Sequence, residues 1–438
     1  MSVDASRTTE VVRLPLWPYA ATAVLGMWLV TAAFTYHPHP ATLLWSDVVS
    51  GTLIVLLSGL ACSGRFSWAA WGLGLIGVWL MTAPLVFWAP TAAAYGAGSL
   101  VGTLVIVFAI LIPGTPGTHE RPGPDIPPGW TYNPSAWTQR AGIIALAFIQ
   151  FFAARYLAAY QLGHIPEVWD PIFGDGTRRV LDSDVSKSFP VSDAGLGAVT
   201  YLLEALTGFL GGTRRWRTMP WAVLLFGVLI IPVGIVSIVL VVLQPLAVGA
   251  WCALCLVTAA LTVLMVSPAV DEVVATGQFL LASRSQGAPF WRTLWQGGKG
   301  ETQGEARPKT NESLLEEIAG GMELNSVPWN LILCAIAGVW LMAVPAVLGI
   351  EGSAATNDLL VGALVTTFAV IGFGEAARAA RWINVPLGVW LLIAPWILSS
   401  NTSSALWNDM AVGVLILVLT VRRGSIKSRF GSWDRFVV

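Results

Sequence analysis

Charged residues are scarce in this sequence. Asp, Glu, Lys and Arg make up 11% of its 438 residues, whereas a soluble domain carries about 25%. Hydrophobic residues make up 55%, and the mean hydropathy is +0.70. Because so few polar side chains could not cover a water-facing surface, the composition excludes a soluble enzyme, a disordered chain and a collagen-like fibre. It predicts an all-α, polytopic integral membrane protein in contact with the lipid bilayer.

Basic charge and cysteine are also in short supply. The 24 Lys and Arg residues nearly balance the 25 Asp and Glu residues, so no basic field exists for nucleic acid. Four cysteines are too few for a disulfide scaffold in a chain of this length. No second cysteine pair or suitably spaced His accompanies Cys252 and Cys255, so we expect no metal site.

Long apolar segments dominate what remains. A helix that crosses the hydrocarbon core needs about 20 apolar residues, and this criterion finds twelve candidate spans in three sets of four. They lie near 15–36, 46–63, 68–88, 92–112, 140–162, 192–211, 219–243, 246–267, 327–349, 357–377, 382–399 and 407–421.

The placement of Lys and Arg predicts the orientation of these spans. Short loops rich in Lys and Arg remain cytoplasmic. If the N-terminus is cytoplasmic and the spans alternate, 20 of the 24 Lys and Arg residues fall on the cytoplasmic side. Arg178, Arg179 and Lys187 fall outside, and Arg155 falls within a span. We therefore expect a multi-pass protein of the cell inner (plasma) membrane with both termini cytoplasmic.

Two polar stretches separate the three sets of spans. The first is rich in Pro and Gly, and the second predicts surface helices near 271–283 and 311–322. The predicted domains are an N-terminal repeat block at 1–112, a cytoplasmic linker at 113–139, a four-helix domain at 140–267, a cytoplasmic linker at 268–326, a C-terminal repeat block at 327–423 and a basic cytoplasmic tail at 424–438.

A short pattern occurs four times in the two repeat blocks. Gly-x-Trp-Leu is followed, 18 or 19 residues after the Trp, by an Asp (or Gly98), and four residues later by a Gly. The small residues predict helix pairs in close contact. We expect Asp47, Asp358 and Asp409 to cap the helices that they open. The four copies begin at Gly26, Gly77, Gly338 and Gly388.

These elements resemble the Ser-Pro-Trp (SPW) repeat membrane family over about 15–112 and 327–423. The last copy contains Ala394-Pro395-Trp396, with Ala in place of the family's Ser, and the other copies lack Pro-Trp. The resemblance implies no known chemistry.

The central block contains a C-x-x-C motif. On a helix, Cys252 and Cys255 lie about one turn apart, so a disulfide needs local distortion at a helix start. The predicted orientation puts them near the outer surface, where disulfides persist, and a thiolate at a helix N-terminus is a good nucleophile. The pattern favours redox function. The alternative, two small apolar residues filling a bundle, is our interpretation of Cys62 and Cys334.

Residues 140–267 resemble the vitamin K epoxide reductase family. The resemblance rests on four helices, a large outer loop after the first, and C-x-x-C at the outer end of the fourth. Residues 173–183 (FGDGTRRVLDS) and 189–201 (FPVSDAGLGAVTY) are also similar to that family's sequence. It implies a thiol–disulfide oxidoreductase whose Cys255 faces a membrane quinone of the ubiquinone or menaquinone type, while Cys252 exchanges with a dithiol.

The sequence departs from that family in one respect. Family members usually carry two more cysteines in the outer loop, and residues 163–191 contain none. Electrons would then reach Cys252 directly from a periplasmic or external thiol protein, or from a small thiol.

Several polar residues are candidates for a quinone site. They are Ser183, Ser186, Asp193 and Trp251, although loop serines commonly cap turns and an Asp near a helix start commonly caps it. Glu204 and Arg155 fall within predicted spans, where an ionisable group suggests function unless the two pair with each other.

Two other functions stay open. One is a non-catalytic membrane scaffold in which the cysteines form a structural or sensory disulfide. The other is a secondary transporter, which is less favoured because the repeats lack evident discontinuous helices and the spans contain little charge.

Overall fold

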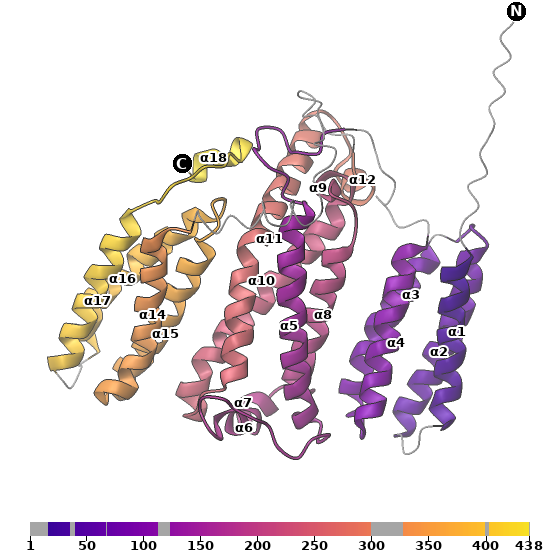
Figure 1. Ribbon diagram of the computed structural model, residues 1–438, viewed down its shortest axis with the longest axis horizontal. Coiled ribbons are helices and arrows are strands. Elements are labelled where there is room, and N and C mark those ends of the chain that lie inside the picture. The colour runs from indigo at the N-terminus through magenta and orange to yellow at the C-terminus, as the bar shows by residue number, and fades with distance from the viewer. Residues whose placement is uncertain are drawn as a thin grey trace, which may run out of the picture. The chain divides into compact units, whose positions relative to one another are not determined.

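The computed structural model describes residues 16–35, 40–66, 68–112, 123–298, 327–398 and 403–437. These residues form helices and one isolated β-bridge, with no strand among them (Figure 1). Eleven of the described helices are long and apolar enough to cross a membrane. The protein is therefore an all-α polytopic membrane protein, as its composition predicts. Its chain divides into two compact units, Met1–Thr115 and Pro116–Val438.

The first unit contains four helices, each about one membrane crossing in length. Its core is aliphatic, with Ile54, Leu73, Leu80 and Val105 fully buried. The helices are α1 (Trp17–Thr35), α2 (Ala41–Cys62), α3 (Trp68–Val86) and α4 (Ala92–Leu111).

The second unit begins with a four-helix bundle, which we call the central bundle. Its helices are α5 (Trp137–Gln161), α8 (Asp193–Phe209), α10 (Pro220–Leu243) and α11 (Ala253–Ser285). Short helices cover both ends, namely α6 (Gly176–Leu181), α7 (Asp184–Lys187), α9 (Arg215–Thr218), the π-helix η1 (Gln244–Val248) and α12 (Phe290–Gln296).

Figure 1 shows α6 and α7 at one end of the central bundle and α9 and α12 at the other. We call these the disulfide end, after Cys252 and Cys255, and the arginine end, after Arg215. The segment that joins α5 to α8 (162–192) contains α6 and α7 and lies over the disulfide end.

The rest of the second unit is the C-terminal helix block. It contains α14 (Trp329–Leu348), α15 (Gly352–Ile371), the 3-10 helix η3 (Arg378–Ile383), α16 (Asn384–Ile397), α17 (Ser403–Val421), the 3-10 helix η4 (Gly431–Trp433) and α18 (Asp434–Val437).

The C-terminal segment fastens this block to the central bundle. Phe430 is fully buried and its ring lies edge-on to that of Trp130, with 5.2 Å between the ring centroids. Gln278 on α11 donates to the Phe430 carbonyl and accepts from the Trp130 indole. The predicted basic tail is thus a packed segment of the second unit.

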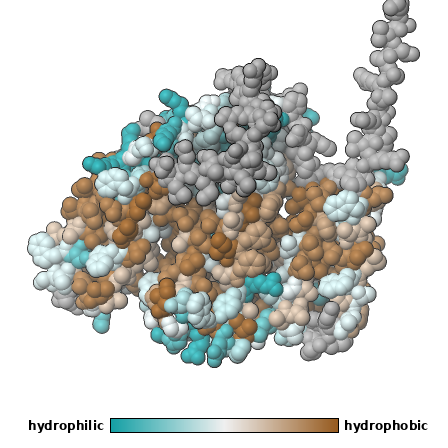
Figure 2. Space-filling model, in the orientation of Figure 1, coloured by the Kyte–Doolittle hydropathy of each residue, from teal (hydrophilic) through white to brown (hydrophobic). Residues whose placement is uncertain are grey.

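Apolar side chains cover the sides of the helices. Leu75 on α3 is 71% exposed, and Val228 on α10 is 65% exposed. Figure 2 shows hydrophobic residues along the sides of the second unit and hydrophilic ones toward its ends. This distribution is the one expected for helices surrounded by lipid, because exposing aliphatic side chains to lipid tails has no free-energy cost.

The predicted span at 192–211 corresponds to α8, whose 17 residues lie at the lower end of the range of about 17–25 for a membrane-crossing helix. One predicted feature is wrong: 271–283 is not a separate surface helix, because α11 runs unbroken from Ala253 to Ser285. Asp271 and Glu272 do not face water, since Tyr132 and Arg215 bind them. The predicted helix at 311–322 lies outside the described residues.

The four repeat copies form the same kind of helix pair. A Cβ atom added to Gly338 would lie 2.6 Å from the Gly362 carbonyl oxygen, and one added to Gly362 would lie 2.5 Å from the Gly338 oxygen. Backbones therefore touch at the glycines of the pattern, as small residues allow. The equivalent contacts are Gly26–Gly51, Gly77–Gly102 and Gly388–Gly413.

The predicted capping role of the repeat aspartates is wrong. The helices begin six residues before these aspartates, so Asp358 and Asp409 lie inside α15 and α17, where they are 0% and 3% exposed. Their asparagine neighbours instead join the two copies crosswise. Trp340 donates to Asn408 at 2.9 Å, and Trp390 donates to Asn357 at 2.7 Å.

The glycine contacts give a matched test of helix packing in the first unit. A Gly77→Ala substitution puts a methyl group 2.8 Å from the Gly102 carbonyl oxygen, whereas Gly74→Ala on the same helix meets nothing within 4 Å. We expect Gly77→Ala to destabilise the unit by about 1–3 kcal/mol. Gly74→Ala should be neutral or stabilising by about 0.5–1 kcal/mol. Thermal unfolding in detergent measures both, and equal effects would contradict close packing at Gly77.

Candidate functional site

Cys252 and Cys255 form a disulfide at the start of α11. Their Cα atoms are 5.3 Å apart. Cys252 is the N-cap residue and has an extended backbone, with φ −109° and ψ 111°, while Cys255 lies in the first helical turn. The extended N-cap is the local distortion that the spacing requires, because it turns the Cys252 side chain back toward the helix.

A tight turn of the chain between η1 and α11 positions the two cysteines at the start of α11. The π-helix η1 ends at Gly249, which adopts the left-handed conformation at φ 64°. Gln244 then accepts a hydrogen bond of 2.9 Å from the Cys252 amide through its side-chain oxygen. Gly249 suits this turn because a residue without Cβ reaches positive φ at little cost.

The two sulfurs have different surroundings. Cys252 is 0% exposed and lies in an apolar cluster with Leu157 and Leu181, against which Val180 and Cys255 pack. Cys255 is only partly buried and lines a cavity. A reagent inside the cavity would therefore meet Cys255, while Cys252 is covered by the α5–α8 segment.

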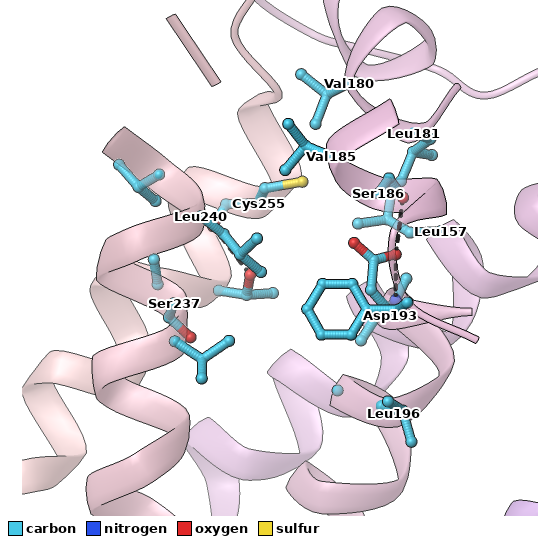
Figure 3. A pocket seen from close by; sticks show the side chains of 18 of the residues that line it. Leu157, Val180, Leu181, Val185, Ser186, Asp193, Leu196, Ser237, Leu240 and Cys255 are labelled. Carbon is cyan, nitrogen blue, oxygen red and sulfur yellow. Dashed lines mark hydrogen bonds between the residues drawn. The ribbon is translucent and has the colours of Figure 1, made fainter. Parts of the chain in front are cut away.

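The cavity lies between the four helices of the central bundle, next to Cys255, and has a volume of about 330 Å³. Its walls are mostly aliphatic, and Ser186 and Asp193 lie across it from Cys255 (Figure 3). Such an apolar space with a few polar groups at one side is typical of a site for a small apolar ligand. Aliphatic lining residues include Leu157, Val185, Leu196 and Leu240.

The structure brings three of the predicted polar residues to this cavity and leaves one outside it. Ser183, Ser186 and Asp193 line it. Trp251 does not, and instead lines a groove toward α14 that contains Pro345. Cys252 follows Trp251 directly in the sequence, but the reversal at η1 turns the indole away from the cavity.

The polar residues also have structural roles. Ser183 caps α7, because its hydroxyl accepts from the Ser186 amide. Ser186 donates to Asp193 at 3.0 Å and accepts from Gln161 at 2.7 Å. Sequence reasoning did not find Gln161 or Gln244, since an isolated Gln near a helix end carries no recognisable pattern.

Asp170 ties the α5–α8 segment to the start of α11. One carboxylate oxygen accepts from the amides of Ile172 and Phe173, and the other accepts from the amide and hydroxyl of Thr177 and from the Ala253 amide at 3.3 Å. We call this set of hydrogen bonds the Asp170 clasp. Because Ala253 follows Cys252 directly, the clasp holds the segment over the buried sulfur.

The hydrogen bonds of the clasp also set the charge state of Asp170. Partial burial alone raises the pKa of Asp170, but the hydrogen bonds from Phe173, Thr177, Ile172 and Ala253 outweigh it and lower the pKa from 3.8 to about 2. A carboxylate with a lowered pKa stabilises the fold above its unfolded value and loses that contribution as the pH falls toward 2. The clasp should therefore stay closed from about pH 4 upward.

Removing the Asp170 charge should expose the disulfide. Asp170→Asn replaces one acceptor oxygen by an NH2 group that faces N–H donors, and a hydrogen bond to a charged group contributes about 1.5–3 kcal/mol. We expect dithiothreitol to reduce the disulfide about tenfold faster, as measured by thiol alkylation and mass spectrometry. Asp175→Asn is the control, because Asp175 is exposed and only pairs with Arg178 at 3.8 Å. Equal rates in both variants would contradict the clasp.

Glu204 and Arg155, for which the sequence left pairing open, do not pair with each other. Both carboxylate oxygens of Glu204 are buried and have no hydrogen-bond partner among the described residues, so Glu204 does not bind Arg155. Glu204 is 0% exposed in α8, whereas Arg155 is partly exposed on α5.

Fold and site together define a polytopic membrane protein that carries a disulfide beside an apolar cavity in a four-helix bundle. Residues 142–269 match the Vitamin K epoxide reductase family, and residues 328–423 match the SPW repeat domain. Both matches confirm resemblances derived from the sequence, while the resemblance of 15–112 stays a prediction. No curated protein and no solved structure matches the chain. The match of the central bundle supports a membrane thiol–disulfide oxidoreductase as the kind of function.

Proposed function

We propose that the central bundle passes two electrons from an external dithiol, through Cys252 and Cys255, to a membrane quinone of the ubiquinone or menaquinone type. The observation that carries the proposal is that Cys255, one half of a disulfide, lines an apolar cavity of about 330 Å³. That volume falls in the range of about 300–1,000 Å³ usual for ligand pockets.

The cavity suits a quinone ring in its chemistry as well as its size. The Ser186 hydroxyl and the Asp193 carboxylate, to both of which Gln161 donates, lie on the side opposite Cys255, and the remaining walls are mostly aliphatic. A bound quinone accepts two electrons and two protons. Ser186, which donates to Asp193, could turn its hydroxyl toward a carbonyl oxygen of such a ring.

The chain's own steps follow thiol–disulfide exchange. A donor thiolate attacks the Cys252 sulfur, the bond between Cys252 and Cys255 breaks, and Cys255 leaves as a thiolate facing the cavity. The second donor thiol then displaces Cys252, so both cysteines are reduced. When the disulfide re-forms, two electrons leave toward the cavity and two protons are released from the thiols. The net reaction converts a dithiol and a quinone into a disulfide and a quinol.

Access to Cys252 requires the α5–α8 segment to move. Cys252 is 0% exposed, and an attacking thiolate must approach the sulfur along the line of the S–S bond. In our proposal the Asp170 clasp opens when the donor docks, and this replaces the relay that loop cysteines would provide.

We further propose that the disulfide end faces the outside of the inner membrane and that both termini are cytoplasmic. This rests on the 20 of 24 Lys and Arg residues assigned to one side. After reduction, a membrane-impermeant maleimide should label Cys255 in intact cells. Labelling of Cys255 only after the membrane is broken would show that the disulfide end faces the cytoplasm, which is the opposite of the proposed orientation.

Quinone reduction by the purified protein tests the proposed reaction. With a dithiol and either ubiquinone or menaquinone, wild-type protein should form quinol, and Cys252→Ala/Cys255→Ala should not. Cys62→Ala/Cys334→Ala is the matched control, because those cysteines are free thiols. An inactive wild type would favour the alternative that the burial of Cys252 suggests, a scaffold with a structural disulfide.

A further inference from the structure

A layer of polar side chains lies beneath the cavity. Gln150 on α5, Glu204 on α8 and Thr262 on α11 are each 1% exposed or less. Each lies four residues, and therefore about one helical turn, from a residue that lines the cavity. We call these three residues the buried polar layer. The cavity-lining residues from which they are counted are Ala154, Thr200 and Thr258.

The buried polar layer has more acceptors than donors. The Gln150 amide nitrogen donates to the Thr262 hydroxyl at 2.9 Å and to the Thr258 carbonyl at 3.2 Å. The Thr262 hydroxyl donates in turn to the Thr258 carbonyl at 3.0 Å. The side-chain oxygen of Gln150 and both oxygens of Glu204 have no hydrogen-bond partner in the described part of the chain. All donors of the layer are therefore used, while three acceptor atoms remain unsatisfied.

A carboxylate in this position would be costly, since a buried anion needs a counter-charge or hydrogen bonds. No basic side chain among the residues that the structure describes supplies a counter-charge. Arg140 and Arg215 lie at the arginine end, where they bind the backbone carbonyls of Gly208 and Thr207. A proton on Glu204 removes the charge and adds the donor that the layer lacks.

The layer is closed on its other side. Below it the four helices pack an apolar cluster, in which α5 contributes Ala147, α10 contributes Phe226 and α11 contributes Met265. These elements bring no titratable group toward Glu204. On α8 itself, Tyr201 precedes Glu204 by one turn and lines the cavity. A proton bound in the layer therefore reaches solvent through the cavity and past Tyr201.

We propose that Glu204 stores a proton beneath the cavity and exchanges it, through the Tyr201 hydroxyl, with the ligand bound above. This rests on the proposed function for the identity of that ligand. When the cysteines re-form their disulfide, two S–H bonds break and two electrons go to the quinone. One quinone oxygen receives the Glu204 proton and the other receives a proton from solvent. Of the two thiol protons, one returns to Glu204 and one goes to solvent, so that protons balance.

Infrared spectroscopy tests the stored proton without any quinone. In the difference spectrum between wild type and Glu204→Gln at neutral pH, we expect the C=O band of a protonated carboxyl. A pair of carboxylate bands in its place would overturn the proposal. This result does not depend on quinone reduction, so it separates the stored proton from the proposed function.

Kinetic measurements then test whether the Glu204 proton takes part in quinone reduction. General acid–base groups contribute about 100-fold or more to rate, so Glu204→Gln should lower kcat for quinone reduction about 100-fold with KM unchanged, and Glu204→Asp should restore part of it. Because Glu204 acts in its protonated form, the fall in kcat at high pH that its deprotonation causes should disappear in Glu204→Gln.

A leucine variant excludes a merely structural explanation. Glu204→Leu removes a buried acid from apolar surroundings, so we expect a melting temperature equal to or above that of the wild type, together with the same loss of kcat. Tyr201→Phe should lower kcat in the same way. Full activity in either Glu204→Leu or Tyr201→Phe would overturn the transfer route.

Discussion

Quinone reduction is expected to stop in a Cys255→Ser protein. A mixed disulfide should accumulate when the donor is supplied in its oxidised, disulfide form, because the Cys252 thiolate attacks that disulfide and releases one donor thiolate. Cys255 is the sulfur that lines the cavity (Figure 3), and Cys252 lies under the α5–α8 segment. Without Cys255, Cys252 has no partner in the chain that can displace the donor. Activity should fall to background, because no other described cysteine lies beside the cavity.

The reverse variant should behave differently. In Cys252→Ser, a protein dithiol has no sulfur to attack beneath the segment, so quinone reduction should stop without a trapped intermediate. Non-reducing electrophoresis and mass spectrometry of the trapped peptide distinguish the two variants. A donor trapped on Cys255 rather than Cys252 would invert the roles proposed for the two cysteines.

A large loss of stability is expected when the buried ion pair at the arginine end is broken. Glu272 accepts two hydrogen bonds from Arg215, at 2.5 and 2.6 Å, and a third from Ser135. The Arg215 and Glu272 side chains are 1% and 2% exposed. Removing one partner of a buried ion pair leaves an uncompensated charge and costs about 3–5 kcal/mol. We expect Glu272→Ala to destabilise the second unit by that amount in thermal or denaturant unfolding.

An exposed pair on the same side supplies the control. Arg214 pairs with Asp125, but their side chains are 33% and 38% exposed. Solvent screens such a pair, so Asp125→Ala should cost less than about 1 kcal/mol. Arg215→Leu/Glu272→Leu, which removes both buried charges, should recover much of the stability lost in Glu272→Ala. Equal losses in Glu272→Ala and Asp125→Ala would contradict the buried ion pair.

Contacts at the arginine end hold the parts of the second unit together. Glu272 belongs to α11, Arg215 to α9 and Ser135 to the segment before α5, so the ion pair and the Ser135 hydrogen bond together join three parts of the second unit. At the same end, the hydrogen bond from Gln278 on α11 to the Phe430 carbonyl connects the C-terminal segment to the central bundle. We expect the central bundle to depend on the C-terminal segment for stability, since Gln278 and Trp130 would lose their partners without it.

The sequence by itself determined the class, the repeat and the location of the cysteine pair. Apolar runs of about 20 residues specify membrane helices because lipid offers no hydrogen bonds to the backbone. The Gly-x-Trp-Leu pattern gave the helix contacts, as at Gly338 and Gly362, because only a residue without a side chain lets backbones touch there. Cys252 and Cys255 are close in sequence, so their pairing is a local property.

Tertiary structure alone decided burial and partnership between distant residues. Asp358 looked like a helix cap because the sequence does not reveal that α15 begins at Gly352. The sequence did not reveal the burial of Asp271 and Glu272, because both look like surface residues until Tyr132 and Arg215, more than 50 positions away, are brought to them. Likewise, the cover over Cys252 and the unsatisfied oxygens of Gln150 and Glu204 depend on which helix faces meet. Hydropathy describes each residue's preference for water. Packing determines which polar residues are nevertheless buried, and which distant residue binds each of them.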